Sequence, residues 1–306
     1  MTGRRLIGYA WTVLAFTVVV IVGGALVRAT GSGAGCGASW PTCQGTVFPA
    51  MEGATAIEFS HRLISGVALL AVFGLIWGVF RAKAKGHPAR RAVVWSGIAI
   101  VGEALIGAVI VLAEWVADDS SVARSVSVPL HLVNTFLLLA ALTLVIFHLG
   151  RDVRTRTIDR QTLWLIRGAG LVFILIAATG AITALADTLF PKGGAGGAMA
   201  ETAEHFLTDL RIVHPILAVG AAVVALSLWS RSGAEASRRT ATVIVALVGG
   251  QIALGFLNVA LDVPLVLQLA HLLVADIMWI ALIWLAAEMR TERVESDRTL
   301  GHHVGA

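Results

Sequence analysis

Charged side chains are scarce in this sequence. Of its 306 residues only 14% are Asp, Glu, Lys or Arg, whereas 57% are hydrophobic. A soluble globular domain carries about 25% charged residues, so the composition excludes an ordinary soluble protein and indicates an integral membrane protein. The sequence also lacks any stripe of basic and aromatic residues, which argues against nucleic acid as a partner.

Cysteine is scarce as well, with only Cys36 and Cys43 in the chain. No further cysteine or nearby histidine completes the ligand set of a usual zinc site, so none is expected. Both cysteines lie in a long Gly-rich segment, residues 29–57, which the loop charges described below place on the outer, oxidising side of the membrane. We therefore expect a disulfide, while a redox-active or substrate-contacting thiol pair stays open as an alternative.

Long apolar segments dominate the rest of the chain. A bilayer core needs about 20 apolar residues per helix, and a backbone in lipid must satisfy its own hydrogen bonds. The sequence therefore predicts an all-α integral membrane protein with eight transmembrane helices. They span about residues 7–28, 58–80, 92–114, 127–149, 162–186, 208–230, 240–261 and 264–287.

The basic residues indicate the orientation of these helices. One side holds the N-terminus, the second, fourth and sixth loops and the C-terminus. It contains every Lys and Arg except Arg28, Arg62, Arg124, Lys192 and Arg211. The positive-inside rule then places both termini in the cytoplasm of a multi-pass protein of the cell membrane. The same asymmetry explains the formal net charge of +4.

Short motifs recur at spacings of about 150 residues, which predicts two homologous halves. Each half has four helices and hence the same orientation, so we expect two pseudo-symmetric four-helix bundles, residues 1–150 and 151–306. The matching motifs are Gly24–Val27 with Gly180–Thr183 and Glu103–Gly107 with Gln251–Gly255.

Four histidines stand near the outer ends of the even-numbered helices, two in each half: His61, His131, His214 and His271. A lone histidine at a helix end is usually an interfacial polar residue, but four at equivalent positions favour ligands. Two imidazoles from facing helices can hold one planar haem iron on its two axial sides. We predict one such site at His61 and His131 and another at His214 and His271.

Glu58 and three arginines lie beside these histidines. Glu58 precedes His61 by three residues and shares its helix face, whereas His214 has Arg211 at that spacing. Beside a cofactor, Glu58 would transfer protons or stabilise positive charge that develops there. Alternatively, it is a carboxylate near the start of a helix that the helix dipole favours. The spacing does not decide between these two interpretations. Arg28, Arg62 and Arg211 are candidates for haem propionates, with lipid headgroups as the alternative.

Other polar features have plainer interpretations. Interhelical hydrogen bonds are the default for polar groups inside apolar helices, and these are Glu103, Asn134, Gln251, Asn258 and Asp276. The Gly-rich stretch 191–197 is expected to be mobile, and the polar tail from Thr291 to be frayed.

The motif around the first site resembles a known family. Gly23-Gly24-Ala25-Leu26-Val27-Arg28-Ala29-Thr30-Gly31-Ser32-Gly33-Ala34-Gly35-Cys36 continues through Trp40-Pro41-Thr42-Cys43 to Glu58-Phe59-Ser60-His61-Arg62. This run closely resembles the first half of haem A synthases, and the four histidines extend the match over nearly the whole chain. Some members carry a second cysteine pair after the fifth helix, which this chain lacks.

The resemblance implies an oxidoreductase that converts haem O to haem A for terminal oxidases. It oxidises the C8 methyl group to a formyl group by successive hydroxylation. The first half would take haem O at His61 and His131, with Glu58 as the functional glutamate. The second half would hold a haem b cofactor through His214 and His271. Haem O synthase and terminal oxidase assembly factors are the implied partners.

Two other functions explain the histidines equally well. One is a di-haem b-type electron-transfer subunit that oxidises quinol without altering haem, and the other is a haem carrier. Neither explains Glu58 or the cysteine loop. The sequence leaves open the electron donor, the source of the inserted oxygen and the oligomeric state, a homo-oligomer included.

Overall fold

The computed structural model describes residues 3–190 and 210–293, and in these ranges eight helices are long and apolar enough to cross a membrane. The predicted all-α membrane fold is confirmed. The helices are α1 (Gly3–Ala29), α2 (Gly53–Ala82), α3 (Pro88–Leu112), α4 (Val122–Gly150), α5 (Arg160–Leu189), α7 (Val213–Arg231), α8 (Glu235–Ala260) and α9 (Leu265–Arg290), with 3-10 turns η1 (Ser32–Ala34) and η2 (Leu210–Ile212).

Most helices begin a few residues before the apolar segments that predicted them, and polar side chains cap some of these first turns. Ser121 accepts a hydrogen bond from the backbone N–H of Arg124 at the start of α4, and Asp159 accepts one from Thr162 at the start of α5. Such side-chain caps satisfy backbone donors that the helix leaves unpaired. The difference that bears on the site is in α2, which begins at Gly53 rather than at residue 58. Glu58 therefore lies in the second turn of this helix instead of at its start.

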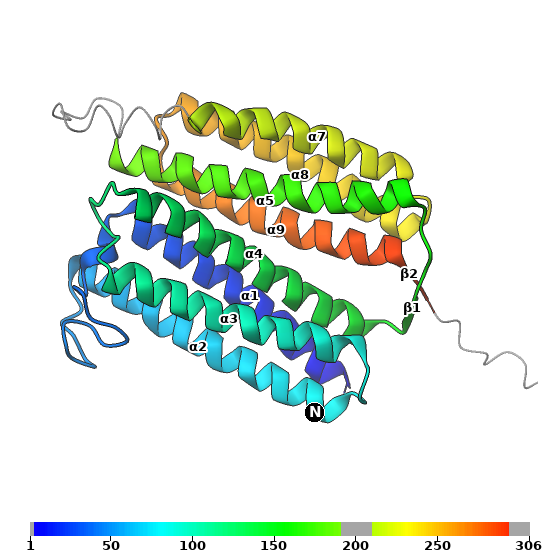
Figure 1. The fold of residues 1–306 in the computed structure, drawn as a ribbon, viewed down its shortest axis with the longest axis horizontal. Coiled ribbons are helices and arrows are strands. Elements are labelled where there is room, and N and C mark those ends of the chain that lie inside the picture. The colour runs from blue at the N-terminus through cyan, green and yellow to red at the C-terminus, as the bar shows by residue number, and fades with distance from the viewer. Residues whose placement is uncertain (1–2, 191–209, 294–306) are drawn as a thin grey trace, which may run out of the picture.

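The helices form two groups that pack side by side (Figure 1). Helices α1 to α4 contact one another in sequence and α4 closes back on α1, while α5, α7, α8 and α9 form a second ring in the same order. The two groups meet mainly where α4 packs on α5 and α9. There the indole N–H of Trp279 donates to the carbonyl of Phe136 at 2.7 Å, and the two rings stack with centroids 5.1 Å apart.

The two ends of the molecule differ. The segment between α1 and α2 lies at one end, and the start of α1 lies toward the other, which also carries a small sheet (Figure 1). That sheet corrects a prediction, because the tail is not frayed from Thr291. Strand β2 (Thr291–Arg293) pairs antiparallel with β1 (Val153–Thr155), and Glu292 forms an ion pair with Arg154. The stretch 191–197 and the tail beyond residue 293 lie outside the described residues.

Asp276 is the most deeply buried charged residue among those described. It has no solvent exposure, and neither carboxyl oxygen has a hydrogen-bond partner in the described part of the chain. Its helix, α9, packs against α4, α1 and α5, so this acid lies within the packed interior. The predicted interhelical hydrogen bond of Asp276 is therefore absent from residues 3–190 and 210–293.

Candidate functional site

The four predicted histidine ligands all lie toward the end of the molecule that carries the α1–α2 segment. His61 is on α2, His131 on α4, His214 on α7 and His271 on α9, and each of these helices begins at that end. All four side chains are partly buried. Within residues 3–190 and 210–293 no group of three or more His, Cys, Asp or Glu side chains is arranged to hold a metal ion.

In each half of the chain, a glycine on the preceding helix lies against the first of the two histidines, His61 or His214. A Cβ added to Gly24 of α1 would lie 3.0 Å from Cε1 of His61, and a Cβ added to Gly180 of α5 would lie 3.0 Å from Cε1 of His214. Glycine in the middle of a helix lowers helix stability by roughly 0.5–1 kcal/mol relative to alanine. The close approach of an imidazole gives both glycines a physical reason to be there.

The second histidine of each half, His131 or His271, also lies near a glycine on the preceding helix, but at a longer distance. A Cβ on Gly107 of α3 would lie 3.9 Å from Nε2 of His131, and a Cβ on Gly255 of α8 would lie 3.6 Å from Cε1 of His271. Each histidine thus faces a glycine on the helix before it. The glycines of the repeated motifs thus take corresponding places beside the four histidines, which supports the predicted repeat.

The two rings of the second pair lie close together. The ring centroids of His214 and His271 are 6.2 Å apart, with an interplanar angle of 60°. Imidazole nitrogens bind metals at about 2 Å, so this separation is of the order needed for one iron between the two rings. Nδ1 of His214 lies 3.0 Å from the carbonyl oxygen of Ile176. That contact orients the ring and leaves Nε2 as the nitrogen available to bind a metal, as the predicted haem site would require.

The rings of His61 and His131 differ from those of the second pair in their hydrogen bonds. Nδ1 of both rings is buried and makes no aligned hydrogen bond in the described structure. Unlike His214, neither ring is fixed by a backbone carbonyl, so their environment differs from that of the second pair.

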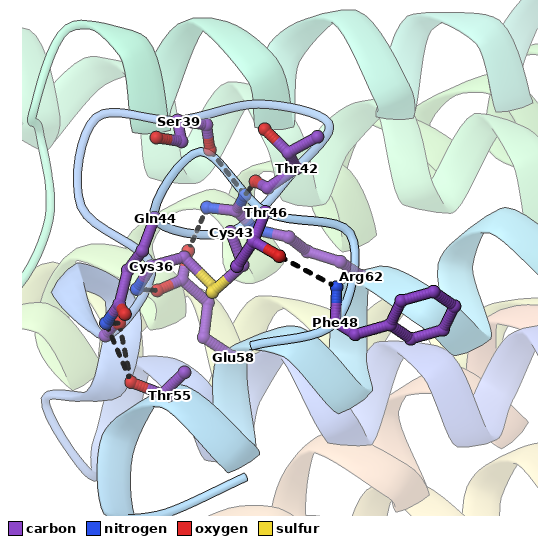
Figure 2. The surroundings of a disulfide bond; sticks show 11 residues. Cys36, Ser39, Thr42, Cys43, Gln44, Thr46, Phe48, Thr55, Glu58 and Arg62 are labelled. Carbon is purple, nitrogen blue, oxygen red and sulfur yellow. Dashed lines mark hydrogen bonds and ion pairs between the residues drawn. A yellow bond between two sulfur atoms is a disulfide. The ribbon is translucent and has the colours of Figure 1, made fainter. Parts of the chain in front are cut away.

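Cys36 and Cys43 form a disulfide, which confirms the predicted bond (Figure 2). The loop that it closes packs directly on the start of α2. A Cβ on Gly35 would lie 2.4 Å from the backbone carbon of Ala54, so no other residue fits there without moving backbone. Thr55 Oγ1 donates to the carbonyl of Gly35 at 2.7 Å, which holds the two segments together.

Glu58 connects this loop to the helix that carries His61. It is only 3% exposed, and one carboxyl oxygen accepts a hydrogen bond of 2.8 Å from the backbone N–H of Cys36. The other oxygen pairs with Arg62, whose guanidinium also donates to the carbonyls of Ser39 and Thr42 (Figure 2). Both oxygens are therefore engaged, and Glu58 and Arg62 together anchor the disulfide loop one turn from His61.

Comparison with known proteins gives the relationship of the whole chain. The family described as cytochrome oxidase assembly protein (COX15-CtaA) matches residues 8–283, which include all four histidines, both cysteines and Glu58. The chain belongs to the COX15-CtaA family.

Individual relatives differ in how much they cover. A Thermus thermophilus protein named protoheme IX farnesyltransferase is 42% identical over 304 residues, which are 95% of this chain and 50% of that protein. This family member thus spans about half the length of that relative. A Bacillus pumilus protein named heme A synthase is 31% identical over 60% of this chain and 61% of that protein. A Bacillus licheniformis protein of the same name is 42% identical over 30% of this chain and 31% of that protein.

The three candidate propionate ligands of this COX15-CtaA protein already have protein partners. Arg62 holds the loop as described, and Arg211 pairs with Asp187 at 2.9 Å. Arg28 donates to the carbonyl of Ala184 at 2.6 Å and to Thr188 and Gln268, all in the second group of helices. Arg28 therefore joins the two groups at the end where the histidines lie, and binding of propionates by any of the three stays a prediction.

Glu103 is the site residue that sequence reasoning missed. The sequence predicts only interhelical hydrogen bonds for it, and it does bond Asn134 and Thr135 of α4. However, its Oε2 also lies 3.1 Å from Nδ1 of His131. The available signal was that the equivalent residue of the second half is Gln251, so the charge occurs in one half only.

Proposed function

We propose that this chain is a haem A synthase, which oxidises the C8 methyl group of haem O to a formyl group by successive hydroxylation. The observation that carries the proposal is an asymmetry between two similar histidine pairs. A disulfide loop, fixed by Glu58 and Arg62, lies next to the His61 pair only. The family, and the relatives named heme A synthase, support the same activity.

The two groups of helices take different roles in this proposal. Residues 1–150 bind the substrate haem O through His61 and His131, and residues 151–306 hold haem b through His214 and His271. When bound, haem b passes electrons one at a time. The chain's own contribution is to fix the four imidazoles against glycines on neighbouring helices, so that each ring presents a nitrogen to its macrocycle.

Glu58 acts by its position and charge in this proposal. Because Arg62 and the N–H of Cys36 occupy its two oxygens, it is not a free base in this arrangement. A buried, preorganised carboxylate next to a reacting macrocycle stabilises positive charge that develops there. It also keeps the loop over the substrate edge, where the loop excludes water.

The membrane orientation follows from the loop charges. We propose that both termini are cytoplasmic and that the disulfide loop and the histidines face the outer side. The separation of the disulfide loop from the start of α1 along the molecule supports this arrangement (Figure 1). A disulfide is also stable on the oxidising side of a cell membrane.

The Thermus relatives suggest a partner. They are named protoheme IX farnesyltransferase, and this chain matches only half of their length. A farnesyl-transfer reaction on protohaem would supply an isoprenylated haem, the class of substrate proposed here. We infer that a haem O synthase works next to this protein, with terminal oxidase assembly as the downstream use.

Pigment analysis tests the proposed function against a di-haem electron-transfer subunit, which the two similar histidine pairs also allow. The protein is purified from cells that make haem O but no other haem A synthase. Its extracted haems should include haem A or the hydroxymethyl intermediate. Extracts that contain haem b alone, from protein with both sites filled, would favour the electron-transfer subunit.

A further inference from the structure

The two histidine pairs differ in the residue that lies beside their second histidine, His131 or His271. This residue is on the preceding helix, α3 or α8. Glu103 on α3 and Gln251 on α8 occupy matching places in the repeated motif. Gln251 donates from Nε2 to the backbone carbonyl of His271 at 2.8 Å, and Nδ1 of His271 has no partner in the described structure. Glu103 instead directs a carboxyl oxygen at the ring of His131.

The Glu103 carboxyl group is held firmly in place. Asn134 Nδ2 donates to Oε1, and Thr135 Oγ1 donates to Oε2 at 2.9 Å. The amide of Asn134 is itself fixed by a hydrogen bond of 2.9 Å to the carbonyl of Ala99 on α3. Both anchors follow His131 within about one turn of α4, so they hold the carboxyl group beside the imidazole.

The contact involves the nitrogen of His131 that is not needed for a ligand bond. Oε2 of Glu103 lies 3.1 Å from Nδ1, although the ring is not turned for an aligned hydrogen bond. Nε2 lies near Gly107 of α3, 3.9 Å from where a Cβ would lie, and makes no hydrogen bond among the described residues. A small rotation of the imidazole therefore aligns Nδ1–H with Oε2 while Nε2 stays available.

We propose that Glu103 is a positioning residue that orients His131 and makes it a stronger electron donor than His271. This inference rests on the proposed function, because it assumes that His131 binds the substrate macrocycle. Carboxylates that accept a hydrogen bond from a ligand histidine fix its orientation and raise its basicity, and their removal typically changes metal affinity roughly 10–100-fold. A stronger donor stabilises ferric over ferrous iron, so the substrate site is easier to oxidise than the cofactor site.

A redox titration of the purified protein tests this inference without measuring turnover. The protein comes from cells that supply haem O, and the first-site haem is defined as the signal lost in His131→Ala. In Glu103→Gln that haem should stay bound, with its equilibrium shifted about tenfold toward the ferrous form, or about 59 mV for one electron. Its low-spin EPR signal should shift as well, and Glu103→Asp should restore part of both changes.

The isosteric change Gln251→Glu in the other half is the matched control, and it should leave the first-site potential unchanged. If Glu103→Gln does not retain haem, Thr135→Val removes one anchor of the carboxyl group and should give a smaller shift of the same sign. A first-site haem whose potential and EPR signal are the same in all variants would overturn the inference alone. If His131→Ala removes no haem signal, the proposed function itself fails.

Discussion

The α-carbon of Gly24 lies so close to the imidazole of His61 that an added methyl group would come within 3.0 Å of its Cε1. Gly180 has the same relationship to His214. Interiors this densely packed do not absorb an extra methyl group without displacement. The orientation of each ring therefore depends on a glycine of a neighbouring helix. The two glycines are about 150 residues apart, as expected for corresponding positions of a repeat.

Gly24→Ala should leave the fold intact and weaken haem binding at the first site by about tenfold, as displacement of a ligand ring does. The helix itself gains stability from alanine, so a loss of haem would not reflect unfolding. Haem content per protein and circular dichroism measure the two effects. Gly66→Ala is the control, because no atom lies within 4 Å of the added Cβ, and equal losses in both variants would contradict the packing argument.

Glu58→Gln should keep both haems bound and lower conversion to haem A by about 100-fold, the usual effect of removing one electrostatic contact to a reacting centre. The amide still accepts the N–H of Cys36 but no longer offsets the charge of Arg62. The extracted haem should therefore remain haem O. Normal haem A output from this variant would rule out a role for the carboxylate in the reaction.

Replacing both Cys36 and Cys43 by serine should reduce conversion without abolishing it. The chain-entropy model assigns about 2–3 kcal/mol to closing so short a loop, but Glu58, Arg62 and Gly35 also hold it. Proteolysis near residues 36–43 should become faster, and haem content should stay unchanged. Complete loss of conversion with an intact loop would instead point to redox-active thiols.

Arg28→Ala should lower the thermal midpoint of the protein in detergent. Its guanidinium makes three hydrogen bonds to the second group of helices, and a hydrogen bond to a charged group contributes about 1.5–3 kcal/mol. Thr188→Val, which removes one acceptor, should give a smaller decrease. If haem is lost from the Arg28 variant at an unchanged midpoint, propionate binding is the better account of this residue.

His214→Ala should remove the b-type haem spectrum, because it deletes one of two rings whose centroids are 6.2 Å apart. The first-site haem should remain. His148→Ala, at the other end of α4, is the control and should leave both spectra unchanged. A b-type spectrum that survives His214→Ala would show that the ligands are paired differently.

Much of the fold follows from the sequence because a membrane span is a local property. The apolar segments predict all eight helices, and the spacing of His61 from Glu58 places them on one helix. The start of α2 at Gly53 was missed, because its first turn, Gly-Ala-Thr-Ala, is only weakly apolar and resembles the Gly-rich segment before it. The pairing of residues 153–155 with 291–293 was missed as well, because short polar strands leave no periodic signal.

The partners of individual side chains were less predictable. Arg28 reaches residues of the second group that are far away in the sequence, and Glu103 meets His131 through the packing of α3 on α4. Sequence spacing indicates which residues share a helix face, but it does not give the rotation of one helix against another. The repeat does carry part of that information, because Glu103 and Gln251 differ where the motifs otherwise agree.

The most direct test of the central claim is an experimental structure of the protein purified with haem O. It should show the isoprenylated macrocycle between α2 and α4, bound by His61 and His131. Haem b should lie between α7 and α9, bound by His214 and His271. The reverse assignment, or haem b at both pairs with the isoprenylated haem bound elsewhere, would contradict the account.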